Sequence, residues 1–271
     1  ENLEELTIEL IDVDTLFMTS IVEMLKINNN LHLLCLSECK INDIVLNILT
    51  DELKFNDSVT ILDLEFNYIS DIGAEHLMRC IELNTKLKKL YLSGNFIGND
   101  GAKYLSYALE ENDTLEDLVL GTNNIYDDGM DYILDSLTKN SCLKLLNVAD
   151  NYLEDNSAEY IMDYLSDNYD LSELIISKNP ISDNGAKFIA EGIINNMTLK
   201  TLHMEKTNIT HIGERYIEKA LQNNRTLHHI RGIESEKCKK LSSSIGVLKR
   251  MKDEFLILRN EKRLASVLLE N

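Results

Sequence analysis

The chain has 271 residues, of which 44% are hydrophobic and 27% are charged, and this balance excludes a disordered polar chain. Because 46 Asp and Glu outnumber 27 Lys and Arg, the net charge is −19, and we expect no nucleic-acid partner. No run of 18 apolar residues occurs, so no membrane span is expected.

Five cysteines are scattered along the chain without any C-x-x-C pair: Cys35, Cys39, Cys80, Cys142 and Cys238. An odd, widely spaced set indicates reduced thiols, which predicts an intracellular, cytoplasmic protein. No metal-ligand spacing recurs among them, so we expect no metal site.

A step of 28 residues organises the sequence. The first apolar column is Leu3, Leu31, Val59, Leu87, Leu115, Leu143, Leu171, Leu199 and Leu227. The fourth position of each repeat reads Leu6, Leu34, Leu62, Leu90, Leu118, Leu146, Leu174, Leu202 and Ile230. The sixth reads Ile8, Leu36, Leu64, Leu92, Leu120, Val148, Ile176 and Met204, and fails at Gly232. Positions four and six face the same side of an extended segment, which predicts a short strand with a buried leucine face in every repeat.

A polar turn and a helix complete each repeat. The ninth position carries Asn67, Asn95, Asn123, Asn151 and Asn179, whose amides are expected to bond the backbone of the turn. We expect helix N-caps at Asp71, Asn99, Asp127, Asp155 and Asp183. Two residues later a small residue, Gly73, Gly101, Gly129, Ser157, Gly185 or Gly213, is expected to let helix and strand approach closely. Asparagine recurs at the twenty-sixth position, from Asn28 to Asn224, and we expect it to end each helix in the left-handed conformation.

The pattern L-x-x-L-x-L-x-x-N-x-I-x-D-x-G-A, as in Leu87 to Ala102, resembles the ribonuclease-inhibitor-like subfamily of leucine-rich repeats. The resemblance implies an α/β horseshoe in which a parallel sheet lines the concave side and helices form the convex side. It predicts a solenoid of eight full repeats and a partial ninth over residues 1–233. The first repeat lacks the turn asparagine and the glycine, so its open end is expected to need a cover.

Residues 234–271 form the expected second unit, a basic helical cap or tail. Residues 225–271 carry 11 Lys and Arg and 6 Asp and Glu, whereas the preceding 224 residues carry 16 and 40. Apolar residues from Leu241 to Leu264 outline an amphipathic helix or helical pair. This segment either caps the solenoid or docks elsewhere as an exposed helix.

No motif for catalysis is found. The H-E-x-x-H, Walker lysine, G-x-S-x-G and paired-carboxylate signatures are missing from the sequence. The glycine-rich run at Gly94, Gly98 and Gly101 is explained by the repeat. We therefore expect no enzyme activity, no catalytic residues and no cofactor.

The third and fifth positions of each strand point away from the core and predict a partner-binding concave face. Several of these positions are apolar where a solvent-facing sheet is usually polar, which is typical of an interface, although ordinary strand propensity also explains such residues. The candidate binding residues are Leu33, Ile61, Asp63, Phe66, Tyr91, Asp117, Val119, Leu145, Asn147, Ile175, His203 and Arg231.

The resemblance implies a protein-binding scaffold that holds another protein on this face. Two alternatives stay open at the level of the sequence. One is a GTPase-activating protein of the Ran type, although that group usually ends in an acidic tail and this chain ends basic. The other is a structural subunit of a larger cytoskeletal or axonemal assembly, which would place the protein in the cytoskeleton or a cilium.

Overall fold

The computed structural model describes residues 3–167 and 170–233, which form one repetitive α/β structure. Its nine strands are β1 (Glu5–Thr7), β2 (Leu33–Cys35), β3 (Ile61–Asp63), β4 (Lys89–Tyr91), β5 (Asp117–Val119), β6 (Leu145–Asn147), β7 (Glu173–Ile175), β8 (Thr201–His203) and β9 (His229–Arg231). The helices between them are α1 (Thr15–Leu25), α2 (Asp43–Leu53), α3 (Asp71–Ile81), α4 (Asn99–Glu111), α5 (Asp127–Leu137), α6 (Asp155–Asp167), α7 (Asp183–Asn195) and α8 (His211–Leu221).

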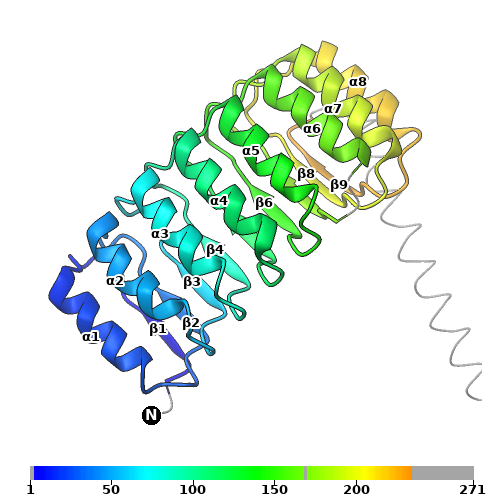
Figure 1. Cartoon of the computed structure of the whole chain (residues 1–271). Helices are drawn as coiled ribbons and strands as arrows, with labels where there is room; N and C mark the ends of the chain where they lie inside the picture. The colour runs from blue at the N-terminus through cyan, green and yellow to red at the C-terminus, as the bar shows by residue number, and fades with distance from the viewer. Residues whose placement is uncertain (1–2, 168–169, 234–271) are drawn as a thin grey trace, which may run out of the picture.

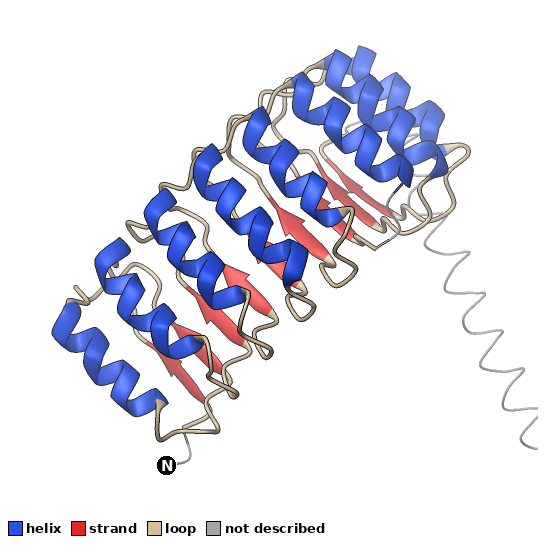
Figure 2. Ribbon diagram, in the orientation of Figure 1, coloured by secondary structure: helices blue, strands red, loops and turns tan. Residues whose placement is uncertain are grey.

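The strands form a single parallel sheet in the order β1 to β9. Each strand residue pairs with the residue 28 positions later, as Leu62 does with Leu90. Figures 1 and 2 show the helices side by side along one face of this sheet. The expected solenoid, with a parallel sheet and helices on one side, is therefore confirmed.

The leucine columns form the interior, as the repeat predicts. From β2 to β8 the fourth-position and sixth-position side chains are fully buried. The end repeats differ: Leu6, Ile8 and Ile230 are only partly buried, and Leu10 and Ile11 of the first repeat are exposed. Each fully buried leucine contributes about 2 kcal/mol by the transfer scale, so these columns are the main source of stability.

The ninth-position asparagines link each turn to its neighbour, which confirms and extends their expected role. Asn95 Nδ2 donates to Leu92 O at 3.0 Å and, one repeat earlier, to Leu64 O at 3.0 Å. Its Oδ1 accepts from the Ile69 N–H at 3.1 Å. Asn67, Asn123, Asn151 and Asn179 repeat this arrangement. The turn asparagines therefore join consecutive repeats through buried hydrogen bonds.

The twenty-sixth-position asparagines that the structure describes, all but Asn168, do not adopt the left-handed conformation, and that expectation was wrong for them. Asn112 has φ −86° and Asn196 has φ −68°. Instead, the asparagine side chain bonds the backbone of the turn. Asn112 Oδ1 accepts from Thr114 N at 3.0 Å and Leu115 N at 2.8 Å, and Nδ2 donates to Ile81 O at 2.8 Å. This asparagine closes the turn and ties it to the preceding repeat.

In each of the eight full repeats a left-handed residue lies at the eighth position, three residues after the end of the strand, and the second repeat has another at Lys40. Leu10, Glu38, Phe66, Thr122, Asp150, Lys178 and Lys206 have φ between 52° and 60°, and Gly94 has φ 71°. A positive φ in a non-glycine residue is sterically unfavourable, so its recurrence shows that the turn geometry requires it.

The expected N-caps are shifted by one residue. Asp71, Asp155 and Asp183 are the first residues of their helices. Ser70 and Ser182, which precede Asp71 and Asp183, are the caps of α3 and α7, and Thr210 caps α8 in the same way. The aspartates instead reach one repeat forward. Asp155 Oδ1 accepts from the N–H groups of Ser182 at 2.7 Å and Gly185 at 3.1 Å, and Oδ2 accepts from Ser182 Oγ at 2.5 Å. Each aspartate thereby stabilises the next helix start.

The expected division at residues 233 and 234 stays a prediction. The basic C-terminal cap or tail, with its amphipathic helix, lies outside the described residues. Among the described residues, none of the helices is long and apolar enough to cross a membrane.

Candidate protein interface

The third and fifth residues of each repeat lie on the face of the sheet opposite the helices, which we call the concave face. They are the first and last residues of the three-residue strands, on either side of the buried leucine. Eleven of the twelve candidate residues occupy such positions in β2 to β9: Leu33, Ile61, Asp63, Tyr91, Asp117, Val119, Leu145, Asn147, Ile175, His203 and Arg231. The twelfth, Phe66, lies in the turn after β3.

The register of the sheet brings apolar candidates together in pairs. Leu33 is beside Ile61, and Tyr91 is beside Val119. All four side chains are partly exposed. The neighbouring Cys35 is buried, and burial raises the pKa of its thiol to about 11. A thiol with this pKa stays protonated at neutral pH and is a poor nucleophile.

Charged and polar residues lie around these apolar pairs. Lys89 Nζ and Asp117 Oδ2 form an ion pair at 2.6 Å across β4 and β5. The hydrogen bond to Asp117 raises the pKa of the Lys89 ammonium group. Asp63 accepts from the Glu65 N–H at 3.0 Å, and Asn147 accepts from the Ala149 N–H at 2.9 Å. The concave face is therefore a mixed surface in which apolar pairs are set among fixed polar groups.

Two histidines and an arginine close the C-terminal end of this face. The His203 and His229 rings lie 5.6 Å apart edge to face, and Arg231 Nε lies 3.2 Å from His229 Nε2. Burial lowers the pKa of His203 and so favours its neutral ring. His203 Nε2 is buried and has no hydrogen-bond partner within the part of the chain that the structure describes. Within the same residues no group of three His, Cys, Asp or Glu side chains is placed to hold a metal ion.

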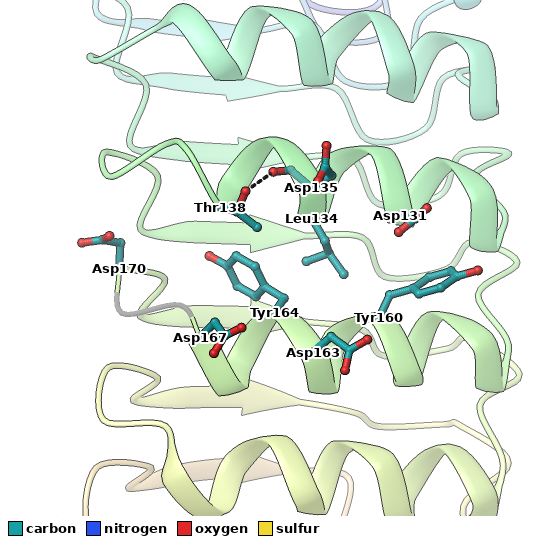
Figure 3. Close-up of a pocket in the computed structure, with 9 residues that line it drawn as sticks. All are labelled: Asp131, Leu134, Asp135, Thr138, Tyr160, Asp163, Tyr164, Asp167 and Asp170. Atoms are coloured by element: carbon teal, nitrogen blue, oxygen red, sulfur yellow. Dashed lines mark hydrogen bonds between the residues drawn. The ribbon is translucent and has the colours of Figure 1, made fainter.

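A second feature lies on the opposite, helical side, between α5 and α6 (Figure 3). It is a pocket of about 390 Å³ lined by Asp131, Leu134, Asp135, Thr138, Tyr160, Asp163, Tyr164, Asp167 and Asp170. Burial raises the pKa of Asp131, and Asp135 and Asp128 raise it further by repulsion. None of the candidate residues lines this acidic pocket.

Sequence reasoning missed a third feature, a row of exposed aromatic rings in the turns between strands and helices. Its members are Phe66, Tyr68, Phe96, Tyr126 and Tyr152, which are 52%, 50%, 54%, 51% and 48% exposed. We call them the aromatic edge. Apart from Phe66, which was assigned to the concave face, they were not singled out. Their signal was available, because Tyr68, Phe96 and Tyr152 share the tenth position of their repeats.

The fold is a strand–helix solenoid, and comparison with known proteins identifies leucine-rich repeats in its sequence. The family model described as Leucine Rich repeat matches residues 55–78, 83–106 and 168–190. No curated protein matches the sequence.

Several solved structures are similar to parts of the chain. Actin-binding site 2 of leiomodin-1 is 24% identical, with a TM-score of 0.42, over 51% of this chain and 82% of that one. The tropomodulin C-terminal domain of Caenorhabditis elegans is 10% identical, with a TM-score of 0.48, over 60% and 98%. An internalin from Listeria monocytogenes is 18% identical, with a TM-score of 0.43, over 74% and 54%.

Proposed function

We propose that this protein is a non-catalytic scaffold of the ribonuclease-inhibitor-like kind that holds another protein on its concave face. The observation that carries the proposal is the set of partly exposed apolar side chains on this face, above all the adjacent Tyr91 and Val119. An aromatic residue packed beside a β-branched one, with charged residues around it, has the composition of an interface centre.

A further property of the face supports this role. The sheet is continuous over nine strands and offers a partner a rigid surface. The scaffold therefore loses little conformational entropy when the partner binds. Nothing in the geometry of the described residues favours GTPase activation or a cytoskeletal role over this one.

The double substitution Tyr91→Ala with Val119→Thr is expected to weaken capture of the partner at least tenfold, about 1.4 kcal/mol, because it removes the central apolar pair. Neither side chain belongs to the buried columns, so the thermal unfolding curve is expected to stay nearly unchanged. The measurement is quantitative mass spectrometry of proteins that the full chain retains from its native source.

Tyr107→Ala is the matched control, because Tyr107 is an exposed tyrosine on α4, away from the concave face. The proposal requires that the control retains the proteins that the double variant loses. Equal retention by all three chains would show that the concave face is not the binding surface.

A further inference from the structure

The aromatic edge contains two stacked pairs of rings and the single ring of Phe66. Tyr68 and Phe96 lie with centroids 6.0 Å apart and planes 30° apart, and Tyr126 and Tyr152 lie 4.8 Å apart at 11°. The Phe66 ring covers the backbone of Gly94. The rings span four consecutive repeats in the turns that lead from β3–β6 into α3–α6. An apolar row of this kind on a solvated edge is typical of a contact surface.

Helix capping does not explain the ring of Tyr126. At the twelfth position of other repeats a hydroxyl caps the helix: Ser70 Oγ accepts from the Ile72 N–H at 3.3 Å, and Thr210 Oγ1 accepts from Ile212 N at 3.2 Å. Tyr126 occupies the same position and makes no side-chain cap. Repeat five therefore lacks a capping hydrogen bond and exposes a tyrosine ring in its place.

The charge around the rings is mainly negative. Lys40 lies beside Phe66 and Tyr68 and is ion-paired with Asp12 at 2.6 Å. Residues 65–72, 93–100, 121–128 and 149–156 contain no Lys or Arg and eight carboxylates: Glu65, Asp71, Asp100, Asp127, Asp128, Asp150, Glu154 and Asp155. Asp150 is paired with Lys178 from the next repeat at 3.0 Å. Asp71, Asp127 and Asp155 accept hydrogen bonds from the next repeat and keep their negative charge. Aromatic faces and carboxylates both attract cations, and the guanidinium group of arginine stacks on rings while bonding carboxylates.

We propose that the aromatic edge binds an extended, arginine-rich segment of a partner protein. The rings cross three steps between strands of roughly 4.8 Å, about 15 Å in all, which an extended chain of about five residues spans. Arginines at alternate positions of such a segment face the rings and the carboxylates between them. Four of its five rings, all but Phe66, lie outside the residues assigned to the concave face, so it is a second contact surface and its test uses none of the concave residues.

The test uses the full chain and a fluorescein-labelled peptide of nine residues in which Arg and Ser alternate, with binding followed by fluorescence anisotropy. Tyr126→Ser with Tyr152→Ala is expected to weaken binding at least tenfold. The control variant, Tyr107→Ala with Tyr216→Ala, removes two exposed helix tyrosines and is expected to bind within twofold of the native chain. All three chains have the same charge, so a difference between them reports the rings alone.

The edge variant is not expected to lose its fold, because a serine at position 126 supplies the hydroxyl cap that α5 lacks. Its melting temperature is therefore expected to match or exceed that of the native chain. Equal peptide binding by the native and edge-variant chains would overturn the proposal. So would sedimentation velocity showing a native dimer that the edge substitutions convert to monomer, since the rings would then bind a second copy of the chain.

Discussion

Replacing Asn123 by alanine is expected to lower the free energy of unfolding by about 3 kcal/mol, because several buried polar groups lose their partner at once. Asn123 Nδ2 donates to Leu92 O at 2.9 Å and Leu120 O at 3.1 Å, and its Oδ1 accepts from Ile97 N at 3.0 Å. The site is buried, so water cannot easily replace these bonds. Urea unfolding monitored by circular dichroism measures the loss.

Asn123→Thr is the graded control, since the chain itself carries threonine at this position in repeat eight. Thr207 Oγ1 donates to Met204 O at 3.1 Å and so satisfies one of the carbonyls. We therefore expect the threonine variant to be more stable than the alanine variant and less stable than the native chain. Native-like stability of Asn123→Ala would show that the asparagine bonds contribute little to stacking.

The second large effect is expected at Gly185, where substitution by valine lowers the free energy of unfolding by about 3 kcal/mol through overpacking. A Cβ atom built on Gly185 would lie 2.5 Å from Ile181 Cγ2 and 2.6 Å from Asp155 Oδ1. A valine would thus displace the aspartate that holds the start of α7. Thermal and urea unfolding of the purified variant measure the effect.

Gly185→Ser is the matched control. Repeat six already has a serine at this position, and Ser157 Oγ donates to Asp127 Oδ1, so a small side chain that bonds the aspartate is accommodated there. The loss for serine is expected to be well below that for valine. If the valine and serine variants lose the same free energy of unfolding, the close approach of helix and turn is not the reason for glycine at this position.

The sequence predicts the fold well because burial repeats with a fixed period. A leucine at the fourth or sixth position has one low-energy environment, the interior, and nine copies of the pattern make that environment unambiguous. The role of the turn asparagines was predicted for a similar reason. Backbone groups in the turn after a strand have no partner in the sheet, and a short amide side chain beside them can bond them.

The two errors concern backbone conformation at the ends of the helix. Asparagine tolerates the left-handed region, but Asn112 is held at negative φ by bonds to the preceding repeat, which a single repeat taken alone does not contain. Likewise Asp155 is a plausible cap by spacing, yet its carboxylate faces the helix start one repeat later. Both residues bond between repeats, whereas the prediction treated each repeat separately.

The concave residues in the strands were predicted because side chains alternate between the two faces of a strand. The aromatic edge was not predicted. Its rings lie in turns that follow a left-handed residue, so no simple period gives the direction of a side chain. The acidic pocket between α5 and α6 was missed because its residues come from two helices whose spacing depends on packing.

Carboxyl labelling with a carbodiimide and glycine ethyl ester, read out by mass spectrometry, tests the central claim most directly. The full chain is labelled alone and with the protein that the Tyr91→Ala, Val119→Thr variant fails to retain. The account predicts that labelling of Asp63 and Glu173 on the concave face falls in the complex, while Asp131 and Asp163 on the helical side are labelled as before. Unchanged labelling of Asp63 and Glu173 together with protection of Asp131 and Asp163 would contradict it.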